Sequence, residues 1–183
     1  MRVVLLLLAT VFVQCANGQD FCKQIKKEMS EDTFQRNYFS PYNEKKLPSV
    51  RVTRSLDNNP ENDGYDNFFL ILRVVGGPVD ALYTKGANGK AVEKTEKNMV
   101  VEFSDKSVLV SDTVAINHDI TDDKAEAIRT IFFPINKATI KDFTTKKIVK
   151  FSLAGYERTF SADSANAVMH YIQCMHAAAK LPD

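Results

Sequence analysis

The sequence predicts an α+β protein with an N-terminal helix, a strongly bent antiparallel sheet or partial barrel, and a long C-terminal closing helix. Apolar residues recur at helical spacing near both ends of the chain, and short alternating segments separated by turn formers fill the middle. Twelve Phe and six Tyr with no Trp are typical of a β-rich core packed by aromatic side chains.

The first 18 residues predict a secretory signal peptide rather than part of the fold. Arg2 gives a positive start, an apolar run too short to span a bilayer follows, and the small residues Ala16 and Gly18 precede the expected cleavage site. We therefore divide the chain into a signal at residues 1–18 and one globular α+β domain at residues 19–183. The protein is expected to be extracytoplasmic, either secreted or periplasmic and envelope-associated.

The elements of the first half follow from periodicity. Residues 20–35 predict the first helix, because Phe21, Ile25 and Met29 lie on one helical face. Residues 49–56 alternate between apolar and polar types and predict a strand. A turn-rich loop is expected at 57–66, followed by a very hydrophobic central strand at 67–75 that ends at the break 76–78. A weaker strand at 81–84 and a turn at 85–90 follow.

Two hairpins are expected in the second half. The first joins strands at 99–103 and 107–110, and the second joins strands at 147–153 and 156–161 through the two-residue turn Ala154-Gly155. In the second hairpin the turn predicts that Leu153 faces Tyr156, Phe151 faces Arg158 and Val149 faces Phe160. Between the hairpins we expect a strand at 125–133 and a short helix at 138–143.

Residues 162–180 predict the closing helix, whose first turn Ser161 or Asp163 can cap. Its polar side is expected to carry Asn166, His170 and Gln173. Its apolar stripe consists of Val168, Tyr171, Ile172, Met175 and Ala179. Strands closed by such a helix resemble the architecture of the pleckstrin-homology-like barrel, an analogy of shape that implies no function.

The chain has three cysteines, Cys15, Cys22 and Cys174. Cys15 lies within the expected signal, and a lipid anchor on it is disfavoured because Gln14 rather than a small residue precedes it. Cys22 and Cys174 then form an even pair in an oxidising compartment, and we predict a disulfide between them. Two buried free thiols are the alternative.

Several clusters could carry chemistry, but none has the spacing of a known site. Asp112, Asp119, Asp122 and Asp123, and separately the loop 57–66, are rich in carboxylates that could bind calcium, although neither fits a calcium-binding loop. We interpret both as solvated surface segments.

His170 and Cys174 share a helix face and could form a zinc or nucleophilic pair, but His118 and His176 have no spacing that adds further ligands. Arg158 places a cation on an apolar hairpin face. We expect it to stack on Phe151 or Tyr156, and an anchor for an anionic ligand is the alternative.

The sequence contains none of the common catalytic or nucleotide-binding motifs. Outside Arg2 the chain carries 23 Lys and Arg against 23 Asp and Glu, which argues against a nucleic-acid partner. After the signal, no apolar run is long enough for a transmembrane segment.

We expect a non-catalytic binding, envelope-associated or interaction protein whose ligand, a protein or a small molecule, is unknown, with no metal or cofactor. The alternative is a small secreted hydrolase with an unrecognised active site. A cleft lined by ionisable groups with shifted pKa values would favour the hydrolase, and a bare or apolar groove would favour binding.

Overall fold

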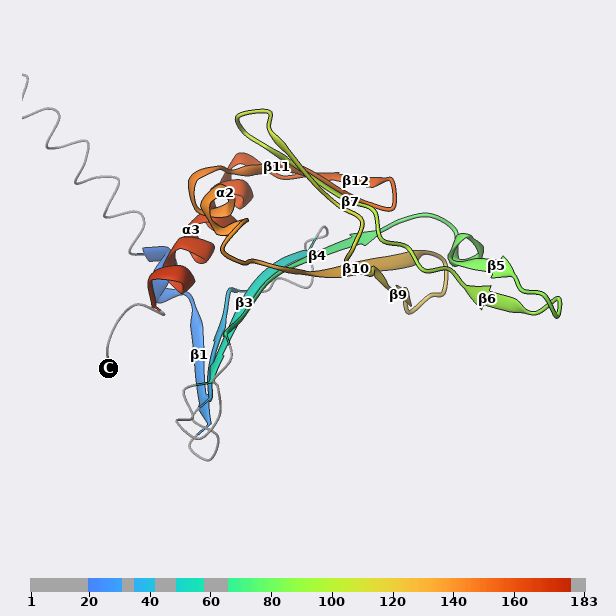
Figure 1. Cartoon of the computed structure of the whole chain (residues 1–183), viewed down its shortest axis with the longest axis horizontal. Helices are drawn as coiled ribbons and strands as arrows, with labels where there is room; N and C mark the ends of the chain where they lie inside the picture. Colours follow the sequence, from blue (N-terminus) through green and yellow to red (C-terminus); the bar gives the residue numbers. More distant parts are fainter. Residues whose placement is uncertain (1–19, 31–34, 42–48, 58–65, 179–183) are drawn as a thin grey trace, which may run out of the picture.

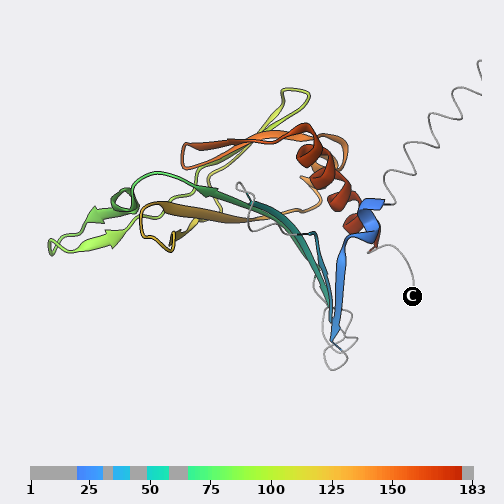
Figure 2. The ribbon, with the colours of Figure 1, turned by 180° about the vertical axis from the view of Figure 1, so that it is seen from behind.

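The structure, a computed structural model, describes residues 20–30, 35–41, 49–57 and 66–178. Two antiparallel sheets face each other, and the C-terminal helix lies at the outer side of the bend in the larger sheet, on the same side as the second sheet (Figure 1). The same arrangement is seen from behind in Figure 2. The α+β class and the C-terminal helix predicted from the sequence are confirmed.

The larger sheet has six strands, and every neighbouring pair is antiparallel. Its long strands β3 and β4 curve so that the sheet has two arms (Figure 1). In spatial order the strands are β1 (Lys26–Ser30), β2 (Gln35–Phe39), β3 (Ser49–Asp57), β4 (Asp66–Val75), β10 (Ala127–Pro134) and β9 (Asn117–Ile120).

The second sheet lies over one arm of the first and has the order β12 (Tyr156–Thr159), β11 (Ile148–Leu153), β7 (Met99–Phe103) and β8 (Val108–Ser111). A small hairpin of β5 (Tyr83–Lys85) and β6 (Ala91–Glu93) extends from the end of that arm (Figure 1). The helices are the 3-10 turn η1 (Val79–Leu82), α2 (Ile140–Thr145) and α3 (Ala162–Ala178). The sheets do not close into a barrel, so the likeness to the pleckstrin-homology-like architecture is limited to the closing helix.

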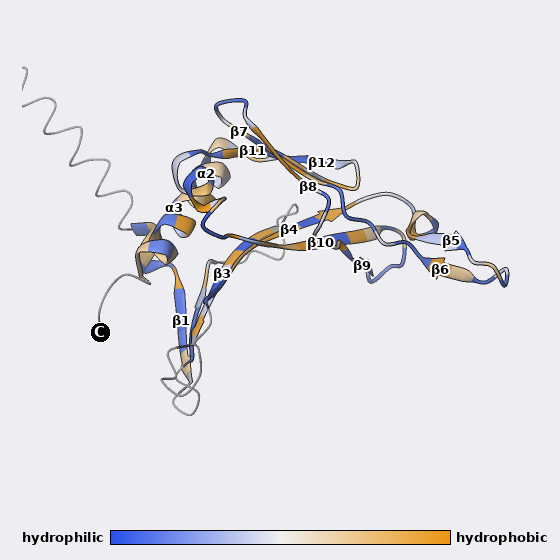
Figure 3. Ribbon diagram, in the orientation of Figure 1, coloured by the Kyte–Doolittle hydropathy of each residue, from blue (hydrophilic) through white to orange (hydrophobic). Residues whose placement is uncertain are grey.

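Alternation along the strands builds the core between the sheets. In β4 the side chains of Leu70, Leu72 and Val74 are fully buried, and in β7 Met99 and Val101 face them from the other sheet. The hydropathy colouring shows apolar stretches in both sheets (Figure 3). Helix α3 contributes Val168, Tyr171, Ile172 and Met175 to the same cluster. Among the described residues, no helix is both long enough and apolar enough to cross a membrane.

The second predicted hairpin is confirmed with its register. Leu153 pairs with Tyr156 and Phe151 with Arg158, and the Phe160 N–H donates to the Val149 carbonyl. The positive φ values of Ala154 and Gly155 belong to the two-residue turn between the strands.

The prediction of a helix over 20–35 is wrong. Only residues 20–23 are helical, and Lys26–Ser30 forms strand β1, which pairs antiparallel with β2. Met29, placed on the apolar helix face by the periodicity, is exposed instead. Pairing with a neighbouring strand supplies backbone hydrogen bonds that local periodicity does not anticipate. The weaker strand predicted at 81–84 is similarly divided between η1 and β5.

The predicted disulfide is present between Cys22 and Cys174, whose Cα atoms are 5.4 Å apart. It fixes the N-terminal helical turn to α3. Phe21 stacks on His170, and the Tyr171 hydroxyl donates to the Gln24 side chain at 2.7 Å. His170 therefore does not face freely into solvent, as the sequence predicted, but lies under Phe21. A disulfide is typical of an oxidising compartment.

Candidate ligand-binding site

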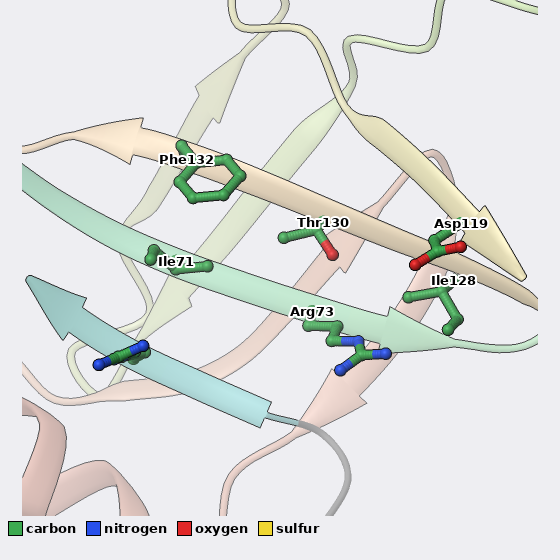
Figure 4. A pocket seen from close by; sticks show the side chains of 7 residues that line it. Ile71, Arg73, Asp119, Ile128, Thr130 and Phe132 are labelled. Carbon is green, nitrogen blue, oxygen red and sulfur yellow. The ribbon is translucent and has the colours of Figure 1, made fainter. Parts of the chain in front are cut away.

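A hollow of about 390 Å³ lies on the face of the six-stranded sheet that points away from the second sheet (Figure 4). Strands β3, β4, β10 and β9 each contribute to it. Its lining residues are Arg51, Ile71, Arg73, Asp119, Ile128, Thr130 and Phe132. The volume falls in the range of small-molecule sites, roughly 300–1,000 Å³.

The strand register explains why these side chains meet. Ile71 on β4 pairs with Arg51 on one side and Phe132 on the other, so the three form a cross-strand row. Arg73 and Thr130 pair two positions further along, and because side chains alternate between faces they join the same surface. This surface combines an apolar floor with two guanidinium groups on the neighbouring strands β3 and β4.

Phe132 is the most unusual member of the hollow. Its side chain is 45% exposed, although it lies in an interior strand whose neighbours Ile131 and Phe133 are buried. On the same face Ile128 is buried and Ile71 is partly buried. A large aromatic side chain left open above apolar neighbours is a feature of binding surfaces.

Charge in the hollow is asymmetric. Arg51 and Arg73 bring two guanidinium groups and Asp119 brings one carboxylate. The Arg51 guanidinium also lies over the Phe39 ring, 4.7 Å from its centroid, which holds its planar group against the sheet. Guanidinium groups are well suited to bind carboxylate, sulfonate or phosphate groups.

A second hollow lies near β6 and β9, beside a network of charged side chains that runs from exposed Glu93 to buried Arg129. The His118 ring is held between two carboxylates: Nδ1 lies 2.9 Å from Glu93 and Nε2 lies 3.0 Å from Glu96. Glu96 also accepts a hydrogen bond of 2.7 Å from the fully buried Arg129. Each ring nitrogen of His118 is therefore hydrogen-bonded to a carboxylate. Neither nitrogen is left to act on a substrate, and we interpret the network as structural.

Arg129 connects this network to the junction of the two sheets. Its guanidinium donates to the Gly76 carbonyl at 2.9 Å and lies over the Tyr156 ring, 3.9 Å from the centroid. The Tyr156 ring in turn lies so close to Gly77 that a Cβ there would come within 2.4 Å of the phenol oxygen. Gly77 therefore allows an aromatic ring to pack directly on the backbone.

Arg158 does not stack as predicted. It donates to the main-chain carbonyl groups of Val75 and Glu157, whereas Arg129 occupies the face of Tyr156. Arg158 thus fixes the end of β12 to β4, and it does not line the hollow on the outer face.

The other residues that the sequence offered for catalysis or metal binding do not come together in one site. Cys174 is bonded to Cys22, so the pair with His170 has no free thiol. Within the described ranges, no group of three or more His, Cys, Asp or Glu side chains fits a metal ion. Asp119 lines the outer hollow, Asp123 accepts hydrogen bonds in its own turn, and most of the loop 57–66 lies outside the described residues.

The pKa values that are clearly shifted belong to groups outside both hollows. A hydrogen bond from the Ser107 hydroxyl lowers the pKa of Asp105 to about 2, and burial raises the pKa of Tyr171. Hydrogen bonds between side chains shift three more groups. The Thr121 hydroxyl lowers the pKa of Asp123, Asp142 raises the pKa of Lys146, and Glu102 raises the pKa of Lys150.

Sequence reasoning did not find the hollow on the outer face. The available signal was that apolar residues occupy both alternating sets of β4, with Phe69 and Ile71 on the face opposite to Leu70 and Leu72. A strand that is apolar on both faces needs cover or a ligand on each.

Comparison with models of known protein families, with curated proteins and with solved structures finds no match to this chain. The site is therefore interpreted from its own chemistry.

Proposed function

We propose that this chain is an exported, non-catalytic binding protein that takes a small ligand with an apolar body and an anionic group in the outer hollow. The observation that carries the proposal is the open Phe132 ring beside Ile71, in a hollow that also contains Ile128 and two arginines on β3 and β4. The apolar floor would bury the ligand's body, and Arg73 with Arg51 would attract its anionic end.

Export is part of this proposal. The pattern of Arg2, apolar run, Ala16 and Gly18 supports cleavage after residue 18, and the Cys22–Cys174 bond supports an oxidising destination. Intact-mass analysis of the exported protein should show a chain that begins at Gln19. A lipid-modified chain beginning at Cys15 would instead indicate a membrane-anchored protein.

The binding test uses two fluorescent probes with the same apolar body. One is 1-anilinonaphthalene-8-sulfonate, and the other is N-phenyl-1-naphthylamine, which lacks the sulfonate. Both should bind the disulfide-bonded protein, and Phe132→Ser should weaken both. Arg73→Gln should weaken only the sulfonate, by at least about tenfold, because a hydrogen bond to a charged group contributes ~1.5–3 kcal/mol.

Lys137→Gln removes an exposed cation outside the hollow and is the matched control. Equal binding of the sulfonate to Arg73→Gln and Lys137→Gln would contradict the assignment of the anionic end. Unchanged binding of both probes to Phe132→Ser would contradict the site itself. Turnover of ester or peptide substrates that Phe132→Ser abolishes would favour the hydrolase instead.

A further inference from the structure

Strand β8 forms one edge of the four-stranded sheet and carries three apolar residues in succession, Val108, Leu109 and Val110. Within the described ranges it pairs with β7 alone. Val108 is 56% exposed and Val110 is 66% exposed. Natural edge strands usually carry a charge, a proline or a bulge that prevents pairing with another chain, and β8 has none of these within its four residues.

The hydrogen-bonding pattern shows which backbone groups face the open edge. In antiparallel pairs, hydrogen-bonded positions alternate with positions whose N–H and C=O point away from the partner. The Phe103 N–H donates to the Ser107 carbonyl, so Leu109 is directed toward β7 two residues later. Val108 and Val110 therefore present their N–H and C=O groups to the open side.

The sequence around β8 is complementary to itself when reversed. Residues 106–112 read Lys-Ser-Val-Leu-Val-Ser-Asp. If a second copy pairs antiparallel about Leu109, Val108 lies opposite Val110, Ser107 opposite Ser111, and Lys106 opposite Asp112. The apolar core of the segment meets apolar residues, and each charged end meets the opposite charge.

The same register satisfies the backbone. Pairing Val108 with Val110 of a second copy, and Val110 with its Val108, brings together the positions whose N–H and C=O groups face outward, which allows four hydrogen bonds. The two Leu109 residues then form a non-hydrogen-bonded pair, in which Cα atoms come to about 4.5 Å. The half-buried Leu109 side chain, now at the rim of the core, would be covered by its equivalent.

We propose that β8 is a self-association edge, through which two copies of this chain join their four-stranded sheets by antiparallel β8–β8 pairing with two-fold symmetry. Lys106 and Asp112 are exposed, and within the described part of the chain neither has an ionic partner of its own. In the dimer the symmetry would give two Lys106–Asp112 contacts, one at each end of the paired segment.

The test is a sedimentation measurement of the disulfide-bonded protein over a concentration series. We expect a monomer–dimer equilibrium. Val110→Pro removes an N–H that faces the open edge but is not used by β7, so the fold should remain while the dimer is lost. Circular dichroism and the melting temperature report whether the variant is folded.

A charge exchange tests the register. Lys106→Asp alone would set two carboxylates opposite each other at both ends, and Asp112→Lys alone would set two amino groups there. Each should weaken dimerisation roughly tenfold, because the symmetry changes two contacts at once. The double variant Lys106→Asp/Asp112→Lys should restore it.

Three outcomes would overturn the proposal. The first is a monomer at every concentration up to the solubility limit. The second is a dimer that folded Val110→Pro leaves unchanged, which would place the interface elsewhere. The third is a double charge variant no stronger than the single variants, which would exclude this pairing about Leu109.

Discussion

The guanidinium of Arg54 donates a hydrogen bond of 2.7 Å to the main-chain carbonyl of Met175. The same side chain binds both carboxylate oxygens of Asp66, at 2.9 and 2.5 Å, and lies over the Phe68 ring. One buried arginine thus connects β3, β4 and the last turn of α3 at the bend of the large sheet. A cation at a helix C-terminus satisfies carbonyl groups that have no partner within the helix.

Arg54→Ala should destabilise the fold by about 3 kcal/mol, because it removes three hydrogen bonds and leaves the Met175 carbonyl without its donor. Arg54→Lys should recover only part of the loss, since an ammonium group cannot bind the carboxylate through two parallel hydrogen bonds. Urea unfolding of the three proteins measures both effects. Equal stability of Arg54→Lys and wild type would show that charge alone is sufficient.

Glu96 and Glu93 offer a matched pair of carboxylates, because both bind His118. The Glu96 side chain is 18% exposed and also pairs with buried Arg129, whereas the Glu93 side chain is 58% exposed. Glu96→Ala should cost about 3 kcal/mol by leaving a buried guanidinium uncompensated. Glu93→Ala should cost less than about 1 kcal/mol. If denaturant melts show a larger loss of stability for Glu93→Ala than for Glu96→Ala, Glu93 rather than Glu96 is the main partner of the buried charges.

Ile172→Ala should cost ~2–5 kcal/mol, because the side chain is buried in the core between α3 and the sheets and its removal leaves a cavity. His170→Ala should cost about 1 kcal/mol through the lost stacking on Phe21, the size of an aromatic pair. Thermal melts of the two variants compare the contributions directly. A larger loss for His170→Ala would mean that the N-terminal turn contributes more to stability than the core face of α3.

The stability that the Asp105 carboxylate gives to the hairpin turn before β8 should be lost in acid. The Ser107 side chain and backbone N–H donate to Asp105, Lys146 pairs with it, and the pKa of Asp105 is about 2, below its value of 3.8 without these partners. A carboxyl with a lowered folded pKa stabilises the fold above its unfolded pKa. That contribution should therefore be lost as pH falls from about 4 to about 2.

Carbon-13 NMR titration of the Asp105 carboxyl group measures this pKa. In Ser107→Ala the pKa should rise toward 3.8, because the hydroxyl hydrogen bond is the largest cause of the shift. An unchanged pKa in that variant would assign the shift to the Ser107 backbone N–H and Lys146 instead.

Local pattern was sufficient where an element is defined by its own sequence. The turn Ala154-Gly155 and the alternation beside it predict the register of β11 and β12, and the stripe on α3 predicts its buried face. The disulfide followed from cysteine number and compartment. In each case the determining interactions are between residues close in sequence or between only two candidates.

The failures have a common cause in tertiary structure. Lys26–Ser30 has helical periodicity but forms an edge strand because β2 supplies backbone partners. The Tyr156 face is occupied by Arg129, which is remote in sequence from the predicted partner Arg158. The outer hollow requires four strands in the correct order, and the sequence contains no signal for the β4–β10 pairing that creates it.

The Cys22–Cys174 bond also determines how the protein would carry a mechanical load. It joins two positions that are 152 residues apart in sequence. Tension applied to the chain outside these cysteines passes through the covalent bond and leaves the hydrogen-bonded strands between them unloaded. Under oxidising conditions, pulling on the termini should therefore lengthen the molecule without unfolding the sheets. Reduction would expose the same sheets to the full force, so their resistance to stretching would depend on the thiol chemistry of the surroundings.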